Sequence, residues 1–175
     1  TPKLSKKKLF NELNFNKNED KYFVLVQHPI IPEVSLQKEQ IRETLDAILD
    51  SNFKCFINYP NSDSGNHDII ESYIEYSNKY PAQFCLFKNL DRLLYVNLLR
   101  NASCLLGNSS SGILEAASLG LPVINIGNRQ KNRICGPNVL FVNNTKNEIL
   151  SAIDKVLNDK KFIEIVSQKY NPYGD

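Results

Sequence analysis

The strongest constraint on the fold is a regular alternation between short apolar runs and amphipathic helical patterns. Residues 22–27 are apolar almost throughout, as expected for a strand that is buried on both faces. A helical pattern follows at about 37–50, and the same order then recurs along the chain. Further strands are expected at residues 54–60, 83–89, 103–107, 121–127 and 138–143, and further helices at about 6–15, 67–80, 90–102, directly after residue 109 and at 145–157.

This order predicts the architecture. Strands that alternate with helices and are apolar on both faces form a parallel sheet that helices cover on each side. We therefore predict an α/β, Rossmann-like domain of three layers with a mainly parallel sheet, and we treat residues 1–175 as a single domain. Right-handed crossovers bring the carboxyl ends of the strands to one edge, where such sheets bind ligands.

The loops that follow the predicted strands carry polar side chains. His28 follows the first strand, and Asn61 lies in the segment YPNSDSGN after the second. The segment GNRQKNR after the fifth strand supplies Arg129, Lys131 and Arg133. A histidine, amides, hydroxyls and cations at one edge suit a phosphorylated ligand better than a metal or a proton relay.

The fourth strand leads into the segment GNSSSGILEAASLG, where Ser109, Ser110 and Ser111 precede Gly112 and a helical pattern. The first N–H groups of a helix have no partner within the helix, and about half a positive charge resides there. A phosphate can take these donors, and a glycine lets the backbone approach it closely. Simple capping, which needs one serine, is the alternative. Glu115, about one turn later, either interacts with the helix dipole or accepts ligand hydroxyls such as those of ribose.

Several other classes of function find no support. A net charge of +2 does not favour a nucleic-acid or acidic-membrane partner. His28 and His67 are the only histidines and lie in no metal-binding spacing, so we predict neither a metal nor a cofactor. The sequence contains no secretory signal and no apolar run of transmembrane length, so we expect a cytoplasmic protein. It also has no methionine and therefore no initiator residue, so we expect this chain to be one domain of a longer protein. The four cysteines lack a Cys-x-x-Cys spacing and are interpreted as unreactive thiols: Cys55, Cys85, Cys104 and Cys135.

The segment GNSSSGILEAASLGLPVINIGNRQ, with QHPI and YPNSDSG upstream, resembles the hydrolysing UDP-N-acetylglucosamine 2-epimerase family. The likeness covers roughly residues 22–157 and is greatest to the sialic-acid and legionaminic-acid branch. Members of this family have a glycosyltransferase-B-like fold, in which two Rossmann-like domains face each other across a cleft. The resemblance implies that this chain is the C-terminal, nucleotide-binding domain.

The resemblance also implies roles for single residues. Ser109 and Ser110 would hold the diphosphate, and Glu115 would accept the ribose hydroxyls. The backbone near Leu90 would hold the uracil, and His28 matches a cleft histidine close to the diphosphate. The predicted UDP-binding residues are Asn61, Leu90, Ser109, Ser110, Ser111, Gly112, Glu115 and Arg129, and the candidate catalytic residue is His28.

The reaction implied by the resemblance converts UDP-N-acetylglucosamine and water into UDP and N-acetylmannosamine. The proton-transferring acids of the family lie in the N-terminal domain, so this domain alone should bind UDP weakly and be inactive. The full-length protein is expected to be a homo-oligomer. Three alternatives stay open: a UDP-sugar-dependent glycosyltransferase, a non-catalytic UDP-sugar sensor, and an epimerase that acts on a 2,4-diacetamido sugar nucleotide.

Overall fold

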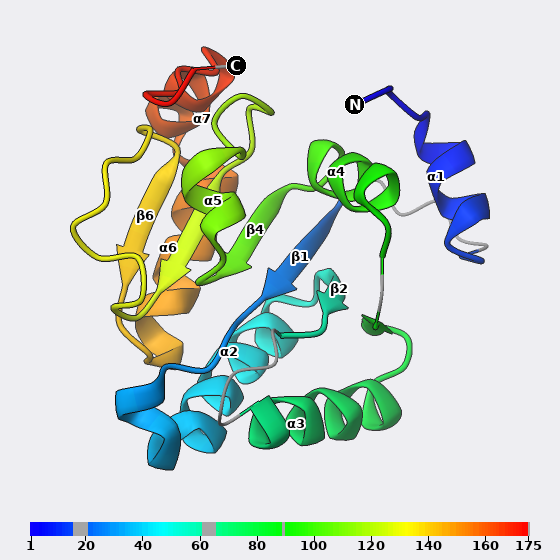
Figure 1. Cartoon of the computed structure of the whole chain (residues 1–175), viewed down its shortest axis with the longest axis vertical. Coiled ribbons are helices and arrows are strands. Elements are labelled where there is room, and N and C mark those ends of the chain that lie inside the picture. The colour runs from blue at the N-terminus through cyan, green and yellow to red at the C-terminus, as the bar shows by residue number, and fades with distance from the viewer. Residues whose placement is uncertain (16–20, 61–65, 89, 175) are drawn as a thin grey trace.

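A computed structural model describes residues 1–15, 21–60, 66–88 and 90–174. Within these residues six strands form one sheet in the order β3-β2-β1-β4-β5-β6, and every neighbouring pair is parallel (Figure 1). The predicted α/β class and parallel sheet are therefore confirmed. The strands are β1 (Tyr22–Val26), β2 (Lys54–Asn58), β3 (Phe84–Phe87), β4 (Cys104–Gly107), β5 (Val123–Ile126) and β6 (Val139–Val142).

The predicted helices are also present, although several are a few residues shorter than expected. A 3-10 helix, η1 (Ile31–Leu36), and the last helix, α7, were not predicted from the sequence. The helix after the serines is only five residues long, and turns follow it. The α-helices are α1 (Lys6–Glu12), α2 (Gln37–Ser51), α3 (Asn66–Lys79), α4 (Arg92–Arg100), α5 (Ser110–Leu114), α6 (Lys146–Asn158) and α7 (Lys160–Ser167).

The alternation of side chains along β1 separates two apolar layers. Phe23 and Leu25 face one side of the sheet, where they join buried side chains of α2, α3, α6 and α7. Tyr22, Val24 and Val26 face the other side, together with apolar residues of α1 and α4. All five strand residues are buried, so the sheet is the middle layer of three, as predicted.

The order in which the parallel strands are added to the sheet reverses between β1 and β4, which are neighbours in the centre (Figure 1). From β1 the strands are added toward one edge of the sheet as far as β3, and from β4 they are added toward the other edge as far as β6. Loops leaving such a reversal point diverge, and the crevice between them is where open α/β sheets bind ligands. Gly107 ends β4 with φ of +123°, and a Cβ there would lie 2.0 Å from the Val26 carbonyl oxygen. Only glycine permits this close exit of β4 beside β1.

Candidate functional site

The residue that joins the ends of β1 and β4 is Asn108, which sequence reasoning did not single out. Its Oδ1 accepts a hydrogen bond from the His28 backbone N–H at 2.7 Å, and its Nδ2 donates to the His28 carbonyl at 2.9 Å. The side chain is buried, so both bonds are shielded from water. Asn108 thereby fixes the backbone of His28 directly beside the serine turn, which we define as residues 109–112.

The loop after β5 is hydrogen-bonded to the same residue. The Asn108 carbonyl accepts one hydrogen bond from Arg129 Nη1 at 2.9 Å and one from Gln130 Nε2 at 3.0 Å. Gln130 is buried and Arg129 is exposed. The predicted candidates His28 and Arg129 are therefore brought together around the first residue of the loop that leads into the serine turn.

The serine turn begins α5 as predicted. Ser109 is the N-cap, and its Oγ accepts a hydrogen bond from the Ser111 N–H at 3.2 Å. Capping therefore accounts for one hydroxyl of the three, and all three serines remain half-buried. Because α5 spans little more than one turn, any attraction for an anion must come mainly from its unpaired N–H groups and the serine hydroxyls rather than from a long helix dipole.

The structure gives Gly112 a packing role. A Cβ at this position would lie 2.9 Å from Val123 Cγ1, because α5 sits directly on β5. The missing side chain therefore lets the helix approach the sheet, which is a separate requirement from the close approach of a ligand that the sequence suggested.

Glu115 lies at the opposite end of α5 and is its C-cap, so the helix dipole does not explain this carboxylate. Instead its Oε1 and Oε2 accept hydrogen bonds from Nη1 and Nη2 of Arg92 at 3.1 and 2.7 Å. Arg92 is the first residue of α4 and is 63% exposed in its side chain, against 31% for Glu115. The hydrogen bonds to Glu115 raise the pKa of the Arg92 guanidinium further, which keeps this side chain charged.

A second side chain from α4 reaches the serine turn. Tyr95 lies one turn after Arg92, and its hydroxyl donates to Ser111 Oγ at 3.3 Å. Burial raises the pKa of Tyr95, which keeps the hydroxyl protonated. Leu90 precedes the N-cap Asp91, whose Oδ1 accepts a hydrogen bond from the Leu94 N–H. The first turn of α4 therefore contacts both Ser111 and Glu115 of the segment around α5, and Leu90 lies two residues before this turn.

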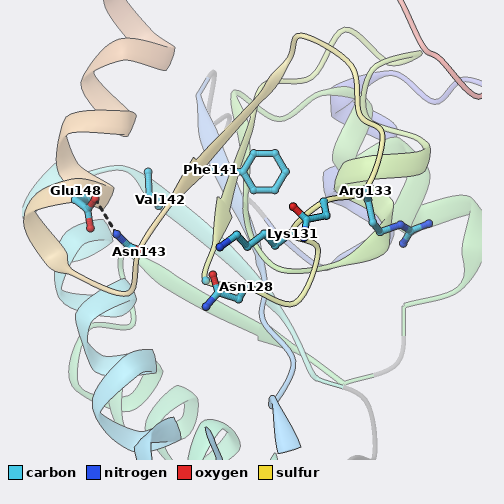
Figure 2. A pocket seen from close by; sticks show the side chains of 9 residues that line it. Asn128, Lys131, Arg133, Phe141, Val142, Asn143 and Glu148 are labelled. Carbon is cyan, nitrogen blue, oxygen red and sulfur yellow. Dashed lines mark hydrogen bonds between the residues drawn. The ribbon is translucent and has the colours of Figure 1, made fainter. Parts of the chain in front are cut away.

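The other two predicted cations lie elsewhere. Lys131 and Arg133 line a cavity of about 300 Å³ at the ends of β5 and β6, together with Phe141. Figure 2 shows Lys131 directed toward this cavity and Arg133 extending the opposite way. Arg133 Nη1 donates to Gln130 Oε1 at 2.9 Å. The three cations expected to act together are thus divided between two places, and only Arg129 contacts the segment of Asn108.

The remaining predictions concern positions outside this cluster. Asn61 lies outside the described residues. Cys55, Cys85 and Cys104 lie in strands, as expected, and burial raises the pKa of each thiol, so they are poor nucleophiles. In the part of the chain that the structure describes, no three His, Cys, Asp or Glu side chains gather as a metal-ligand set. None of the described helices is both long enough and apolar enough to span a bilayer.

Comparison with known proteins shows the family of this chain. A family profile described as UDP-N-acetylglucosamine 2-epimerase matches residues 2–175. The chain is 36% identical to the UDP-N,N'-diacetylbacillosamine 2-epimerase (hydrolyzing) of Legionella pneumophila, over 99% of this chain and 44% of that protein. It is 37% identical to the polysialic acid biosynthesis protein P7 of Escherichia coli, over 93% of this chain and 41% of that protein.

A solved structure has the same fold. The UDP-GlcNAc 2-epimerase of Methanocaldococcus jannaschii, in complex with UDP-GlcNAc and UDP, superimposes with a TM-score of 0.70 at 18% identity. The match covers 97% of this chain and 44% of that chain, so this chain corresponds to one Rossmann-like half of a glycosyltransferase-B-like fold. The chain spans less than half the length of the curated relatives it matches. From the family profile, these relatives and the fold, the chain belongs to the UDP-N-acetylglucosamine 2-epimerase family.

Proposed function

We propose that this chain is the UDP-binding domain of a hydrolysing UDP-N-acetylglucosamine 2-epimerase. The observation that carries the proposal is the arrangement of α5 at the central reversal point of the sheet. Hydroxyl groups of Ser109 and Ser110 lie at its start, and the carboxylate of Glu115 lies at its end. A rise of about 1.5 Å per residue places the backbone of Ser110 and that of Glu115 roughly 7 Å apart along the helix axis, a span that suits the diphosphate and the ribose of one nucleotide.

The proposed reaction places a clear demand on this domain. A base of the second domain removes the proton at C2 while the bond between C1 of the sugar and UDP breaks, which leaves a glycal with a C1–C2 double bond and a departing UDP. Water then adds its oxygen to C1, and a proton returns to C2 on the opposite face, so the configuration at C2 is inverted. Donors fixed before the reaction stabilise developing negative charge best. The serine turn and the remaining N–H groups of Arg129 would supply such donors, and His28, fixed through Asn108, is the candidate proton donor to the leaving group.

The substrate class is a UDP-linked 2-acetamido sugar. One relative is named for a diacetamido sugar nucleotide and another for polysialic acid biosynthesis. We therefore propose a role in sialic-acid-type sugar biosynthesis, with UDP-N-acetylglucosamine as the first substrate to test and its 2,4-diacetamido counterpart as the second. The proposal includes a second domain with the proton-transferring acids, no metal or redox cofactor, and a homo-oligomeric full-length protein in the cytoplasm.

Calorimetric titration with UDP tests the diphosphate site. We expect saturable binding to the chain, and loss of most of that binding in the Ser109→Ala, Ser110→Ala double variant. Ser77→Ala is the control, because the Ser77 hydroxyl donates to the Tyr73 carbonyl within α3, on the other face of the sheet. If the double variant binds UDP as tightly as the wild type, the serines serve only as a helix cap.

The ribose assignment has its own test, in which UDP and pyrophosphate are compared in Glu115→Ala. Only UDP offers ribose hydroxyls, so the variant should weaken UDP binding by roughly tenfold and leave pyrophosphate binding close to that of the wild type. Equal losses for the two ligands would remove Glu115 from ribose recognition.

Turnover by the full-length protein in D₂O separates the classes of function. An epimerase of this type should release free N-acetylmannosamine that carries deuterium at C2, because the C2 proton is lost and then regained from solvent. Transfer of the sugar to an acceptor without such exchange would indicate a glycosyltransferase instead. Binding with no turnover of either sugar nucleotide would indicate a sensor.

A further inference from the structure

The contact between Arg92 and Glu115 is the least explained feature of the candidate site. The two residues lie 23 positions apart and belong to different elements, and both guanidinium Nη atoms donate to the carboxylate. The pair borders a cavity of about 520 Å³ beside α4 and α5, so it is accessible from solvent. An exposed ion pair contributes little to stability, about 0–1 kcal/mol. Its position at the proposed ribose-binding carboxylate calls for another role.

The geometry leaves the carboxylate able to bind a ligand. An ionised carboxylate has about four lone-pair sites, and the two N–H groups of Arg92 use one on each oxygen. Each Glu115 oxygen therefore keeps a free acceptor site. A bidentate contact also fixes the plane of the carboxylate, which a single hydrogen bond or a point charge would leave free to rotate.

The charges of Arg92 and Glu115 also favour a role of this pair in ligand binding. Glu115 lies one short helix from the serine turn, so an unpaired carboxylate there would repel a bound diphosphate. Arg92 neutralises it without occupying the serine turn. Tyr95, one turn further along α4, holds Ser111 on the side of the phosphates. One face of the first turn of α4 therefore contacts both parts of the site.

We propose that Arg92 is a positioning residue for ribose recognition. It holds the Glu115 carboxylate in the orientation in which the two remaining acceptor sites meet the 2′- and 3′-hydroxyls of the nucleotide. The Arg92 contact persists when the nucleotide is bound, so the ribose adds to the ion pair rather than displacing it. This inference rests on the proposed UDP site and assigns its selectivity for ribose over deoxyribose to a residue of α4.

The test is a comparison of three ligands by calorimetry: UDP, 2′-deoxy-UDP and pyrophosphate. The wild-type chain should bind UDP roughly tenfold more tightly than 2′-deoxy-UDP, since the deoxynucleotide leaves one acceptor of a charged group unpaired. Arg92→Ala should weaken UDP binding about three- to fivefold and reduce the preference over 2′-deoxy-UDP by a similar factor. Pyrophosphate lacks the ribose and meets only the unpaired charge of Glu115 in this variant, so its affinity should fall by less than that of UDP.

Two further variants separate geometry from charge. Arg92→Lys keeps the positive charge but cannot form two parallel N–H bonds, so the loss of preference for UDP should persist. Arg42→Ala is the matched control, because Arg42 forms the same bidentate contact with Glu75, at 2.9 and 3.1 Å, between α2 and α3. That pair lies on the opposite face of the sheet, and all three affinities should be unchanged.

Each other outcome has a defined meaning. Failure of the wild-type chain to bind UDP at millimolar concentration would overturn the proposed site and this inference with it. UDP binding that Arg92→Ala leaves unchanged would overturn the inference alone. Equal losses for all three ligands, restored by Arg92→Lys, would make Arg92 a general phosphate cation. Tighter UDP binding in Arg92→Ala would mean that the ion pair competes with the ribose. Both of these results also contradict the inference.

Discussion

Asn108 shows how much of the site depends on one side chain. Its side-chain amide accepts a hydrogen bond from the His28 N–H and donates one to the His28 carbonyl. Its backbone carbonyl accepts hydrogen bonds from the side chains of Arg129 and Gln130. The ends of β1, β4 and β5 are therefore joined through a single buried residue. No other side chain of this size offers a donor and an acceptor in the same plane.

Replacing Asn108 with Asp should destabilise the protein. The carboxylate can still accept from the His28 N–H, but its second oxygen would face the His28 carbonyl with no proton between them. We expect a loss of about 1–3 kcal/mol in the free energy of unfolding, measured with urea. The control is Asn128→Asp, at an exposed position of the loop after β5. Equal stabilities for the two variants would show that the Asn108 bonds contribute nothing.

Sequence reasoning succeeded for residues whose partners lie close in the chain. Ser109 caps α5, the helix predicted directly after residue 109, and Thr145 caps α6, the helix predicted from residue 145, by accepting from the Glu148 N–H. Such contacts follow from local backbone geometry. The pairing of Arg92 with Glu115 could not be predicted in this way, since it depends on how α4 and α5 pack on the sheet. The spacing of Arg92 and Tyr95, which places them on one face of α4, was the available signal.

At the scale of elements, the contact between α5 and β5 sets where the serine turn lies. Gly112 is buried, and Val123 of β5 occupies the space that a side chain would need. The sequence predicted the helix and its first residue but not its brevity, because the apolar pattern continues through the turns at 115–119. It also missed α7, where Asp159 both ends α6 and caps the next helix, with Phe162 and Val166 buried.

The variants Gly112→Ala and Val123→Ala test this contact. The first should destabilise the fold by about 1–3 kcal/mol through overpacking, only partly offset by the higher helix propensity of alanine. The second leaves a small cavity. Since the two changes complement each other in space, the double variant should be more stable than the sum of the single effects predicts, as a double-mutant cycle in urea would measure. Strict additivity would show that α5 does not rest on Val123.

At the scale of the whole molecule, the sheet divides the apolar interior into two layers that share each strand. Phe53 packs against the layer beneath α2 and α3, and Phe87 against the layer beneath α4. Alternate residues of one strand serve the two layers, so neither layer can be lost without disrupting the other. The sequence predicted this arrangement, because its strand segments have apolar residues at consecutive positions and therefore on both faces of the sheet.

Single tryptophan probes test whether residues 1–175 act as one unit. The chain contains no tryptophan, so Phe53→Trp and Phe87→Trp each introduce one reporter, on opposite faces of the sheet. The two thermal transitions should coincide. UDP at about 100 times its Kd should stabilise both by about 2.7 kcal/mol, or roughly 5–10 °C. Separate transitions, or a shift seen by only one probe, would contradict a single cooperative domain.

The placement of the proposed ligand-binding groups also bears on how such proteins diversify. These groups come from the segments that follow the strands and from the exposed first turn of α4, whereas the buried layers lie between sheet and helices. Substitutions that alter nucleotide selectivity can therefore accumulate while the interior stays intact. Asn108 and Gly112 are the exceptions, since each serves the interior and the edge together. Descendants of one ancestral sequence should accordingly vary at Arg92 and Lys131 long before they vary at these two positions.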